Sequence, residues 1–133
     1  MSNKALSEDY LKRARLRLKI LTEFLNEKDY ADVIRTCQEI VELVQESILI
    51  KMGINPPKWH DVIDIILENR KKLPENIAHE LSKLRKDSKW LRSQREIAFY
   101  GDVDFIPTKD YTLKDANKAI SVAKKFLEIS EKV

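Results

Sequence analysis

The chain contains few of the residues that crosslink or interrupt a fold. Among its 133 residues there are one cysteine, two histidines, two glycines and four prolines. A single cysteine, Cys37, excludes an internal disulfide and favours a reducing compartment. So few glycines and prolines are typical of long helices with short connections. Almost no stretch alternates apolar and polar residues with a period of two, so strands are not expected.

Long apolar runs and a strong charge imbalance are also missing. No run reaches the length of a membrane-spanning helix, and no secretory leader is recognisable, so we expect a cytoplasmic protein without membrane contact. The formal net charge is +3, and basic and acidic residues are mixed along most of the chain. Charge alone therefore does not indicate a nucleic-acid partner.

Familiar catalytic and metal-binding patterns are absent from the sequence. There is no glycine-rich phosphate loop, no paired histidine and carboxylate at metal spacing, and no nucleophile beside a base. His60 and His79 stand far apart in the sequence, and we expect neither a metal nor a cofactor. His60 is interpreted as a hydrogen-bonding anchor of its loop, with an acid–base role as the alternative.

Apolar residues at helical spacing dominate what is present. Steps of three and four residues predict helices over about 7–26, 30–52, 59–72 and 74–100, and a last helix that Thr112 caps and whose apolar stripe runs from Ala116 to Leu127. Ser7 is the expected N-cap of the first helix, Gly53 ends the second, and Thr112 with Asp115 forms a capping box on the last. The sequence thus predicts one all-α domain over residues 1–133, an up-and-down antiparallel bundle of about five helices, four of them long.

Arg95 is the unusual residue of the fourth predicted helix. It shares one helical stripe with apolar and small residues, namely Ile77, Leu81, Leu84, Ser88, Leu91 and Ala98. A guanidinium on such a stripe is unfavourable unless it is paired. Two explanations stand with equal weight. Arg95 either bonds carbonyls or a carboxylate inside the bundle, or faces a cleft or subunit interface and serves function.

Two basic surfaces accompany this arginine. On the first helix Lys12, Arg15 and Lys19 form a row, which we interpret as a solvated face in preference to an anion site. On the fourth helix Arg85, Lys89 and Arg92 share one face, here called the basic ridge. With Trp90 and Phe99 nearby, the basic ridge is the best candidate for contacting phosphates and bases. An ordinary exposed charged helix is the alternative.

Several segments resemble the HEPN domain, a small helical domain found in prokaryotic toxins and beside minimal nucleotidyltransferases. In chain order they are Asp29-Tyr30-Ala31-Asp32, Val41-Glu42, Gly53, Pro56-Pro57-Lys58-Trp59-His60-Asp61, Arg95-Glu96-Ile97-Ala98-Phe99-Tyr100 and Asp115-Ala116. Together they span the chain from about residue 6 to the C-terminus. The resemblance implies an antiparallel helical bundle that often forms homodimers.

The same resemblance bears on catalysis. Active members of the family cleave RNA without a metal, using an arginine followed four to six residues later by a histidine. On this chain the arginine corresponds to Arg95, and the window holds Tyr100, Gly101 and Asp102 but no histidine. The histidine is expected to move a proton of the attacking hydroxyl or of its leaving group. Enzymatic activity is therefore left open, and binding without cleavage is favoured.

Three functional hypotheses follow. The first is a nucleotide- or RNA-binding module that acts as a homodimer and partners a minimal nucleotidyltransferase in a toxin–antitoxin-like system. Its binding residues would be Arg85, Lys89, Arg92, Arg95, Tyr100 and Asp102. The second is a weak metal-independent ribonuclease in which Arg95 stabilises the phosphorane charge and Tyr100 or His60 handles protons. The third is a structural or protein-docking bundle in which Arg95 pairs with a carboxylate such as Glu42.

Overall fold

The chain folds into helices throughout the part that the structure, a computed structural model, describes, residues 3–56 and 61–133. In order, the helices are α1 (Lys4–Asn26), α2 (Tyr30–Lys51), α3 (Val62–Glu68), a 3₁₀ turn (Arg70–Lys72), α4 (Glu75–Lys83), α5 (Arg85–Ser93), α6 (Arg95–Tyr100), α7 (Pro107–Asp110) and α8 (Leu113–Ser130). Extended pairing in this part of the chain is limited to an isolated bridge between Asp102 and Phe105. The all-α prediction is confirmed.

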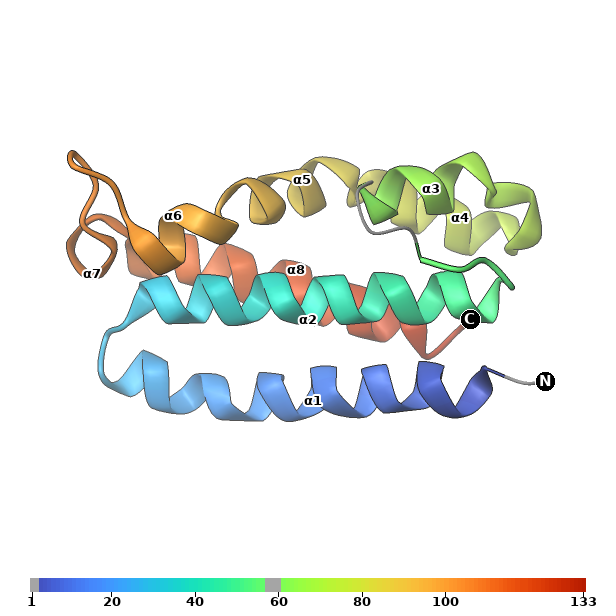
Figure 1. Ribbon diagram of the computed structural model, residues 1–133, viewed down its shortest axis with the longest axis horizontal. Coiled ribbons are helices and arrows are strands. Elements are labelled where there is room, and N and C mark those ends of the chain that lie inside the picture. Colours follow the sequence, from blue (N-terminus) through green and yellow to red (C-terminus); the bar gives the residue numbers. More distant parts are fainter. Residues whose placement is uncertain (1–2, 57–60) are drawn as a thin grey trace.

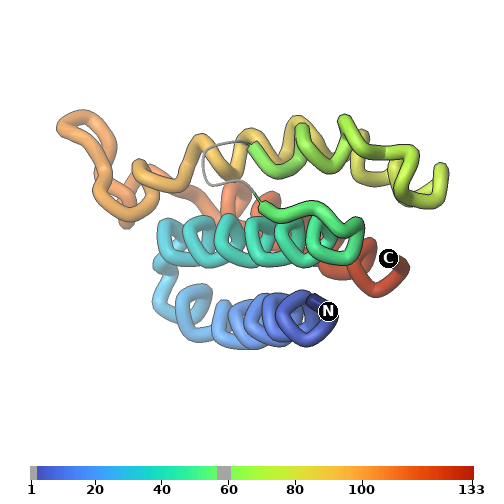
Figure 2. Tube along the Cα trace, turned by 45° about the vertical axis from the view of Figure 1, so that its right-hand side comes forward, coloured from blue at the N-terminus to red at the C-terminus, as the bar shows by residue number. Residues whose placement is uncertain are grey.

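The long elements run up and down beside one another (Figures 1 and 2). α1 and α2 are antiparallel, an arm made of α4, α5 and α6 returns along α2, and α8 closes the bundle behind it. α3 and α7 are short connecting helices at the two ends of the arm. The predicted antiparallel bundle is therefore confirmed. No helix among the described residues has the length and apolar character needed to cross a membrane.

α2 is the central helix of the bundle, because it packs against α1, α8 and the arm. From Ala31 to Ile50 its side chains are buried except along one stripe. The part-exposed members of that stripe recur every three or four residues: Asp32, Arg35, Glu39, Glu42 and Glu46. Every member is charged, so the one open side of α2 is polar. The thiol of Cys37 is buried among apolar neighbours, and burial raises its pKa to about 12.

The start of α1 differs from the prediction. The helix begins at Lys4, so Ser7 lies inside it and is fully buried. Its hydroxyl lies 2.7 Å from the hydroxyl of Ser47 on α2, and Ser47 Oγ donates to the Ser7 carbonyl at 3.0 Å. Assigning Ser7 as the N-cap was therefore wrong. The serine joins two helices instead of beginning one.

Other predicted boundaries agree more closely with the structure. Gly53 follows the end of α2 with a φ of 80°, as expected of a residue that ends a helix. Thr112 and Asp115 form the predicted capping box at the start of α8. α3 begins at Val62, so Asp61 is its N-cap residue and does not lie in its first turn. The predicted opening of this helix by Trp59 and His60 lies outside the described residues.

The arm was predicted as one helix over 74–100, and this was wrong. It is interrupted at Leu84 and again at Gln94, where ψ is near 0° and the backbone N–H bonds to a carbonyl three residues back. Leu84 turns its side chain into the core at the first interruption. At the second, Gln94 Oε1 accepts a hydrogen bond of 2.7 Å from the Tyr111 hydroxyl. The fourth long element is thus three short helices in succession.

Candidate functional site

Arg95 does not lie on the apolar stripe that the sequence predicted. Because the arm is interrupted at Gln94, that glutamine is half-buried and bonds Tyr111, while Arg95 begins α6 with a side chain that is 47% exposed. Ala98 remains buried as predicted. Arg95 therefore faces the surface of the bundle.

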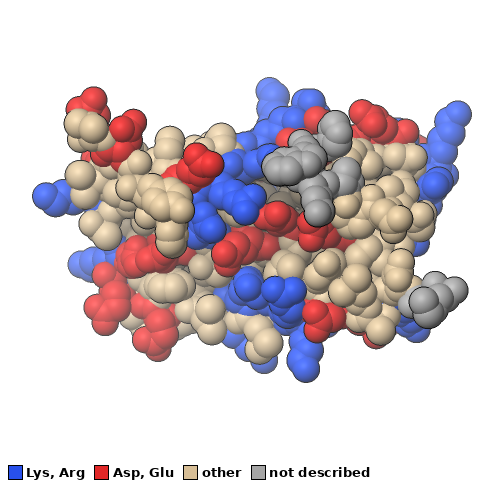
Figure 3. Space-filling view, viewed as in Figure 1, with Lys and Arg blue, Asp and Glu red and all other residues tan. Residues whose placement is uncertain are grey.

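A groove of about 280 Å³ opens between α1, α2 and α6, with Arg95 in its wall. We call it the Arg95 groove. Its charged residues are the arginines Arg13, Arg17, Arg35 and Arg95 and the glutamates Glu39, Glu42 and Glu46. The glutamates lie on the open stripe of α2 and form the floor. Figure 3 shows an acidic band across the middle of this face, with basic side chains above and below it.

Ion pairs hold most of these arginines. Arg95 Nη1 lies 3.9 Å from Glu42 Oε1, the partner proposed from the sequence. Glu39 is contacted by Arg17 Nε at 3.3 Å and by Arg35 Nε at 3.6 Å. Arg35 also donates to the Arg95 carbonyl at 2.9 Å. The backbone of α6 is therefore bonded to a side chain of α2. Of the three ion pairs, that of the Arg95 guanidinium is the longest.

Two further groups show how the floor of the groove is built. Burial raises the pKa of Glu46, and the neighbouring Glu42 raises it further while Arg13 opposes the shift. Gln38 is 4% exposed, and its Nε2 donates to Glu42 Oε2 at 3.1 Å. Its Oε1 is buried and has no hydrogen-bond partner among the described residues. The floor therefore holds an unsatisfied acceptor beside a crowded row of carboxylates.

A second hollow adjoins the first at Arg95. It measures about 380 Å³ and is lined by Arg92, Ser93, Arg95, Glu96 and Ile97. α6 ends in an exposed aromatic pair, Phe99 and Tyr100, whose rings meet edge to face with 4.8 Å between their centres. Tyr100 is 78% exposed, and the Arg35 guanidinium lies 5.1 Å from the Phe99 ring centre. Arg95 thus stands between two hollows and next to exposed aromatic rings.

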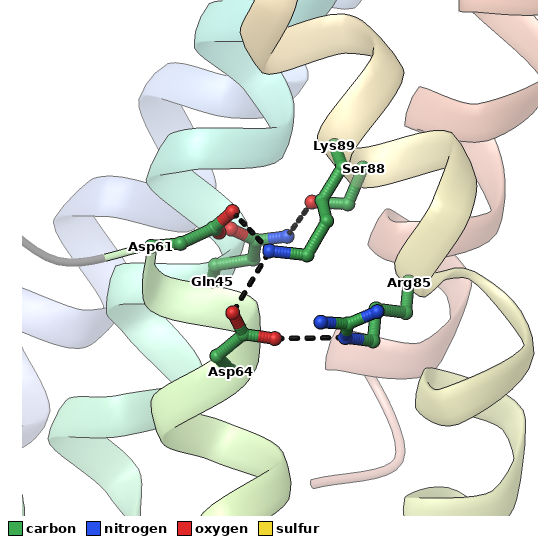
Figure 4. A network of polar contacts seen from close by, with 6 residues as sticks. All are labelled: Gln45, Asp61, Asp64, Arg85, Ser88 and Lys89. Carbon is green, nitrogen blue, oxygen red and sulfur yellow. Dashed lines mark hydrogen bonds and ion pairs between the residues drawn. The ribbon is translucent and has the colours of Figure 1, made fainter.

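The basic ridge is largely neutralised (Figure 4). Arg85 Nε bonds Asp64 at 2.8 Å, and Lys89 Nζ bonds Asp61 at 2.9 Å and Asp64 at 2.8 Å. These bonds lower the pKa of Asp64 and raise that of Lys89. Beside them Gln45 donates to the Ser88 hydroxyl at 2.7 Å. Of the ridge residues, Arg92 alone has no ion pair within the described chain and reaches the second hollow.

The remaining predicted residues lie in different places. Asp102 lines neither hollow; it accepts from the Val103 N–H at 2.6 Å and holds the turn after α6. His60 lies outside the described residues. Sequence reasoning missed Arg35, Gln38 and the groove side of α1. The charged residues spaced every three or four positions along the otherwise apolar α2 were the signal that pointed to the floor.

In the described residues no group of three or more histidine, cysteine or acidic side chains could hold a metal ion.

Comparison with known families agrees with the helical architecture. No curated protein and no solved structure matches the chain. The family model described as HEPN domain matches residues 7–133, nearly the whole sequence. The chain therefore belongs to the HEPN domain family.

Proposed function

We propose that this HEPN-domain protein is a cytoplasmic nucleotide- or RNA-binding module. It acts as a homodimer and partners a minimal nucleotidyltransferase in a toxin–antitoxin-like pair. The observation that supports binding is the position of Arg95, which is half-exposed between two hollows and adjoins an exposed aromatic pair.

The chemistry of these groups suits a nucleotide. A guanidinium grips phosphate oxygens with two parallel N–H donors, and Arg92 in the same hollow adds a second positive charge. Exposed aromatic rings such as Tyr100 stack on bases of any sequence.

Glu42 is the competitor of any phosphate at Arg95. Its contact with Arg95 is 3.9 Å long and joins two part-exposed side chains. Such pairs contribute about 0.2–1 kcal/mol, so a phosphate can displace the carboxylate. Three glutamates on the floor repel an extended polyanion. We therefore expect a short contact of one or a few nucleotides, centred on Arg95 and Arg92, in place of a long track.

The Arg95–Glu42 contact also favours a second candidate function, a structural or docking bundle in which the arginine only pairs with the carboxylate. The two candidate functions predict different effects of removing the Arg95 side chain on stability and on binding. A half-exposed pair contributes little to folding, whereas a binding arginine contributes most of its effect when ligand is present. Stability and binding must therefore be measured on the same variant.

The test is fluorescence anisotropy of labelled single-stranded RNA and of labelled ATP in EDTA, with wild type, Arg95→Ala and Arg85→Ala. Arg85 is the matched control because Asp64 holds it away from both hollows. We expect Arg95→Ala to weaken binding about tenfold or more, which corresponds to about 1.4 kcal/mol. Arg85→Ala should stay within about twofold of wild type, and wild-type binding should weaken with salt.

Unchanged affinity in Arg95→Ala would contradict the proposal. A loss of about 0.2–1 kcal/mol in unfolding free energy without any change in binding would support the structural candidate. The same samples, run on a denaturing gel, also report cleavage. Cleavage that Arg95→Ala abolishes would show that the family's metal-independent ribonuclease activity persists without the histidine.

A further inference from the structure

The turn between α6 and α7 forms an exposed end of the bundle that is both apolar and acidic. We call it the acidic tip, and define it by Asp102, Val103, Asp104, Ile106 and Asp110. Val103 is 90% exposed and Ile106 46%, although both are large and apolar. Residues 101–110 include three aspartates and one lysine. The tip projects beyond the other elements in both views of the backbone (Figures 1 and 2).

The conformation of the tip is fixed by its own hydrogen bonds. Asp110 Oδ2 accepts from the Ile106 N–H at 2.6 Å, and Asp102 and Phe105 exchange two backbone hydrogen bonds. Asp104 has no ion pair or hydrogen bond among the described residues. An apolar surface held in place and left open to solvent is typical of a protein contact.

The outer side of α1 has the opposite charge and the same mixture of groups. The basic row of Lys12, Arg15 and Lys19 is exposed, and none of the three has an ion pair within the described chain. Residues 12–20 contain five basic residues and no acidic one. Beside the row lie Leu16 and Ile20, one helical turn apart, which are 50% and 53% exposed. This surface complements the acidic tip in charge and offers apolar side chains of similar size.

The two surfaces cannot meet within one molecule. In both backbone views α1 lies along one side of α2, and the tip projects on the other side, beyond α6. A contact between them therefore needs a second copy of the chain. With a two-fold axis, each copy would contribute one tip and one row, so the assembly would close at two copies.

We propose that the acidic tip of one copy docks on the basic row of α1, with Leu16 and Ile20, of a second copy. Val103 and Ile106 then cover the two apolar side chains of α1, while Asp104 and its neighbours face the basic row. This inference rests on one part of the proposed function, the homodimer. It adds to that part the two surfaces through which the copies meet.

A second copy fits these surfaces better than RNA does. Phosphates would match the basic row but would leave Leu16 and Ile20 without an apolar partner. The acidic tip repels RNA and would remain exposed. A contact between tip and row satisfies both the charges and the apolar groups of both surfaces.

The test is a charge-exchange experiment read by sedimentation equilibrium across about 1–500 μM protein at low salt. The row variant carries Lys12→Glu, Arg15→Glu and Lys19→Glu, and the tip variant carries Val103→Lys and Asp104→Lys. A control carries Lys124→Glu and Lys125→Glu, which reverses two exposed lysines in the C-terminal half of α8, at the end of the bundle opposite the tip (Figure 1). Circular dichroism confirms that each variant is folded.

We expect wild type and control to dimerise, and each charge variant alone to have a dissociation constant raised at least tenfold. An equimolar mixture of row and tip variants should recover a one-to-one heterodimer, because the reversed charges match again. The proposal is overturned by a monomeric wild type, by variants that dimerise normally, or by a mixture that does not associate. Loss of RNA binding in the row variant without loss of the dimer would also overturn it, since the row would then bind nucleic acid.

The tip variant separates this inference from the proposed function. Its substitutions lie outside both hollows, so its RNA binding reports on the Arg95 site without the dimer. Suppose that the charge variants and their mixture dimerise as expected but neither wild type nor any variant binds RNA. This result would contradict only the proposed function. RNA binding with a dimer insensitive to both charge variants would contradict only the inference.

Discussion

Tyr111 joins the start of α8 to the second interruption of the arm. Its hydroxyl donates to Gln94 Oε1 at 2.7 Å, and its ring meets Phe105 edge to face with 4.9 Å between centres. The side chain is buried. That burial, with a smaller effect of Asp115, raises the pKa of the phenol to about 12. One residue therefore links the break in the arm to the turn that carries the acidic tip.

Tyr111→Phe should lower the free energy of unfolding at pH 7 by about 0.5–1.5 kcal/mol, the usual contribution of one hydrogen bond. The raised pKa sets the pH dependence. Stability from the protonated phenol is fully present below its unfolded pKa near 10 and is lost as the pH rises through about 12. Phenylalanine cannot ionise, so the gap between wild type and variant should narrow above pH 10.

Urea denaturation at pH 7 and at several values up to pH 11 measures that gap. Tyr100→Phe serves as the control at pH 7, because the Tyr100 side chain is 78% exposed and should tolerate loss of its hydroxyl within about 0.5 kcal/mol. A difference in unfolding free energy that stays constant from pH 7 to pH 11 would show that folding does not raise the pKa of the Tyr111 hydroxyl.

At the residue scale the sequence identified Arg95 but not its environment. Placing Arg95 on the apolar stripe required one continuous helix. The helix is interrupted at Gln94, so the helical spacing does not continue through Arg95. The ion pairs of the basic ridge were missed for another reason. Arg85 and Lys89 meet acids that are 21 to 28 residues away in the sequence, and local spacing cannot show pairs formed by tertiary packing.

Among the elements, α6 is ended by a residue whose conformation excludes a side chain. Gly101 has a φ of 69°, in the left-handed region. A Cβ atom built on it would lie 2.7 Å from Pro107 Cδ and 2.9 Å from the Phe105 carbonyl oxygen. Gly53, after α2, has a φ of 80° but has open space around the same position. Substitution of alanine at Gly53 would therefore cause backbone strain alone, whereas the same substitution at Gly101 would cause backbone strain and steric overlap.

Gly101→Ala should destabilise the protein more than Gly53→Ala does. Positive φ alone costs about 1 kcal/mol for alanine, which is the effect expected at Gly53. At Gly101 the overlap with Pro107 and Phe105 adds about 1–3 kcal/mol. Thermal and urea denaturation of both variants measure the difference. Equal losses would mean that the turn after α6 adjusts freely.

At the element scale the sequence predicted the helices that carry their own signals. α2 and α8 have apolar spacing, a C-terminal glycine or a capping box, and their positions agree with the structure. The interruptions of the arm carry no such signal, because no glycine or proline lies between Glu75 and Tyr100. Ser7 has the residues of an N-cap, with acids following it, and only its contact with Ser47 shows otherwise.

Over the whole molecule, the contact between Ser7 and Ser47 couples two helices across forty residues of sequence. Each hydroxyl also has a backbone carbonyl within reach, Ser47 O for Ser7 and Ser7 O for Ser47. Either single alanine substitution removes the contact between hydroxyls but leaves the other serine a partner. The two substitutions should therefore not be additive.

Ser7→Ala and Ser47→Ala should each lower the free energy of unfolding by about 0.5–1.5 kcal/mol. The double variant should cost less than their sum by about 0.5 kcal/mol or more, because the shared bond is lost only once. Urea denaturation of all four proteins gives the coupling energy. Ser7→Ala with Ser93→Ala is the control, since the Ser93 hydroxyl bonds within its own turn of α5. Additive losses for Ser7 and Ser47 would contradict the coupling.

The packing of other helices around α2 affects which walls of the Arg95 groove can fluctuate. Amide hydrogens of α2 lie beneath α1, α8 and the arm, so their exchange with solvent requires the bundle to open as a whole. α6 is six residues long and ends at a turn, so it opens locally at a lower free energy. We therefore expect the α6 wall of the groove to fluctuate above a floor that does not. A ligand of the proposed kind would then be accommodated by displacement of α6 while the carboxylates of α2 stay in place.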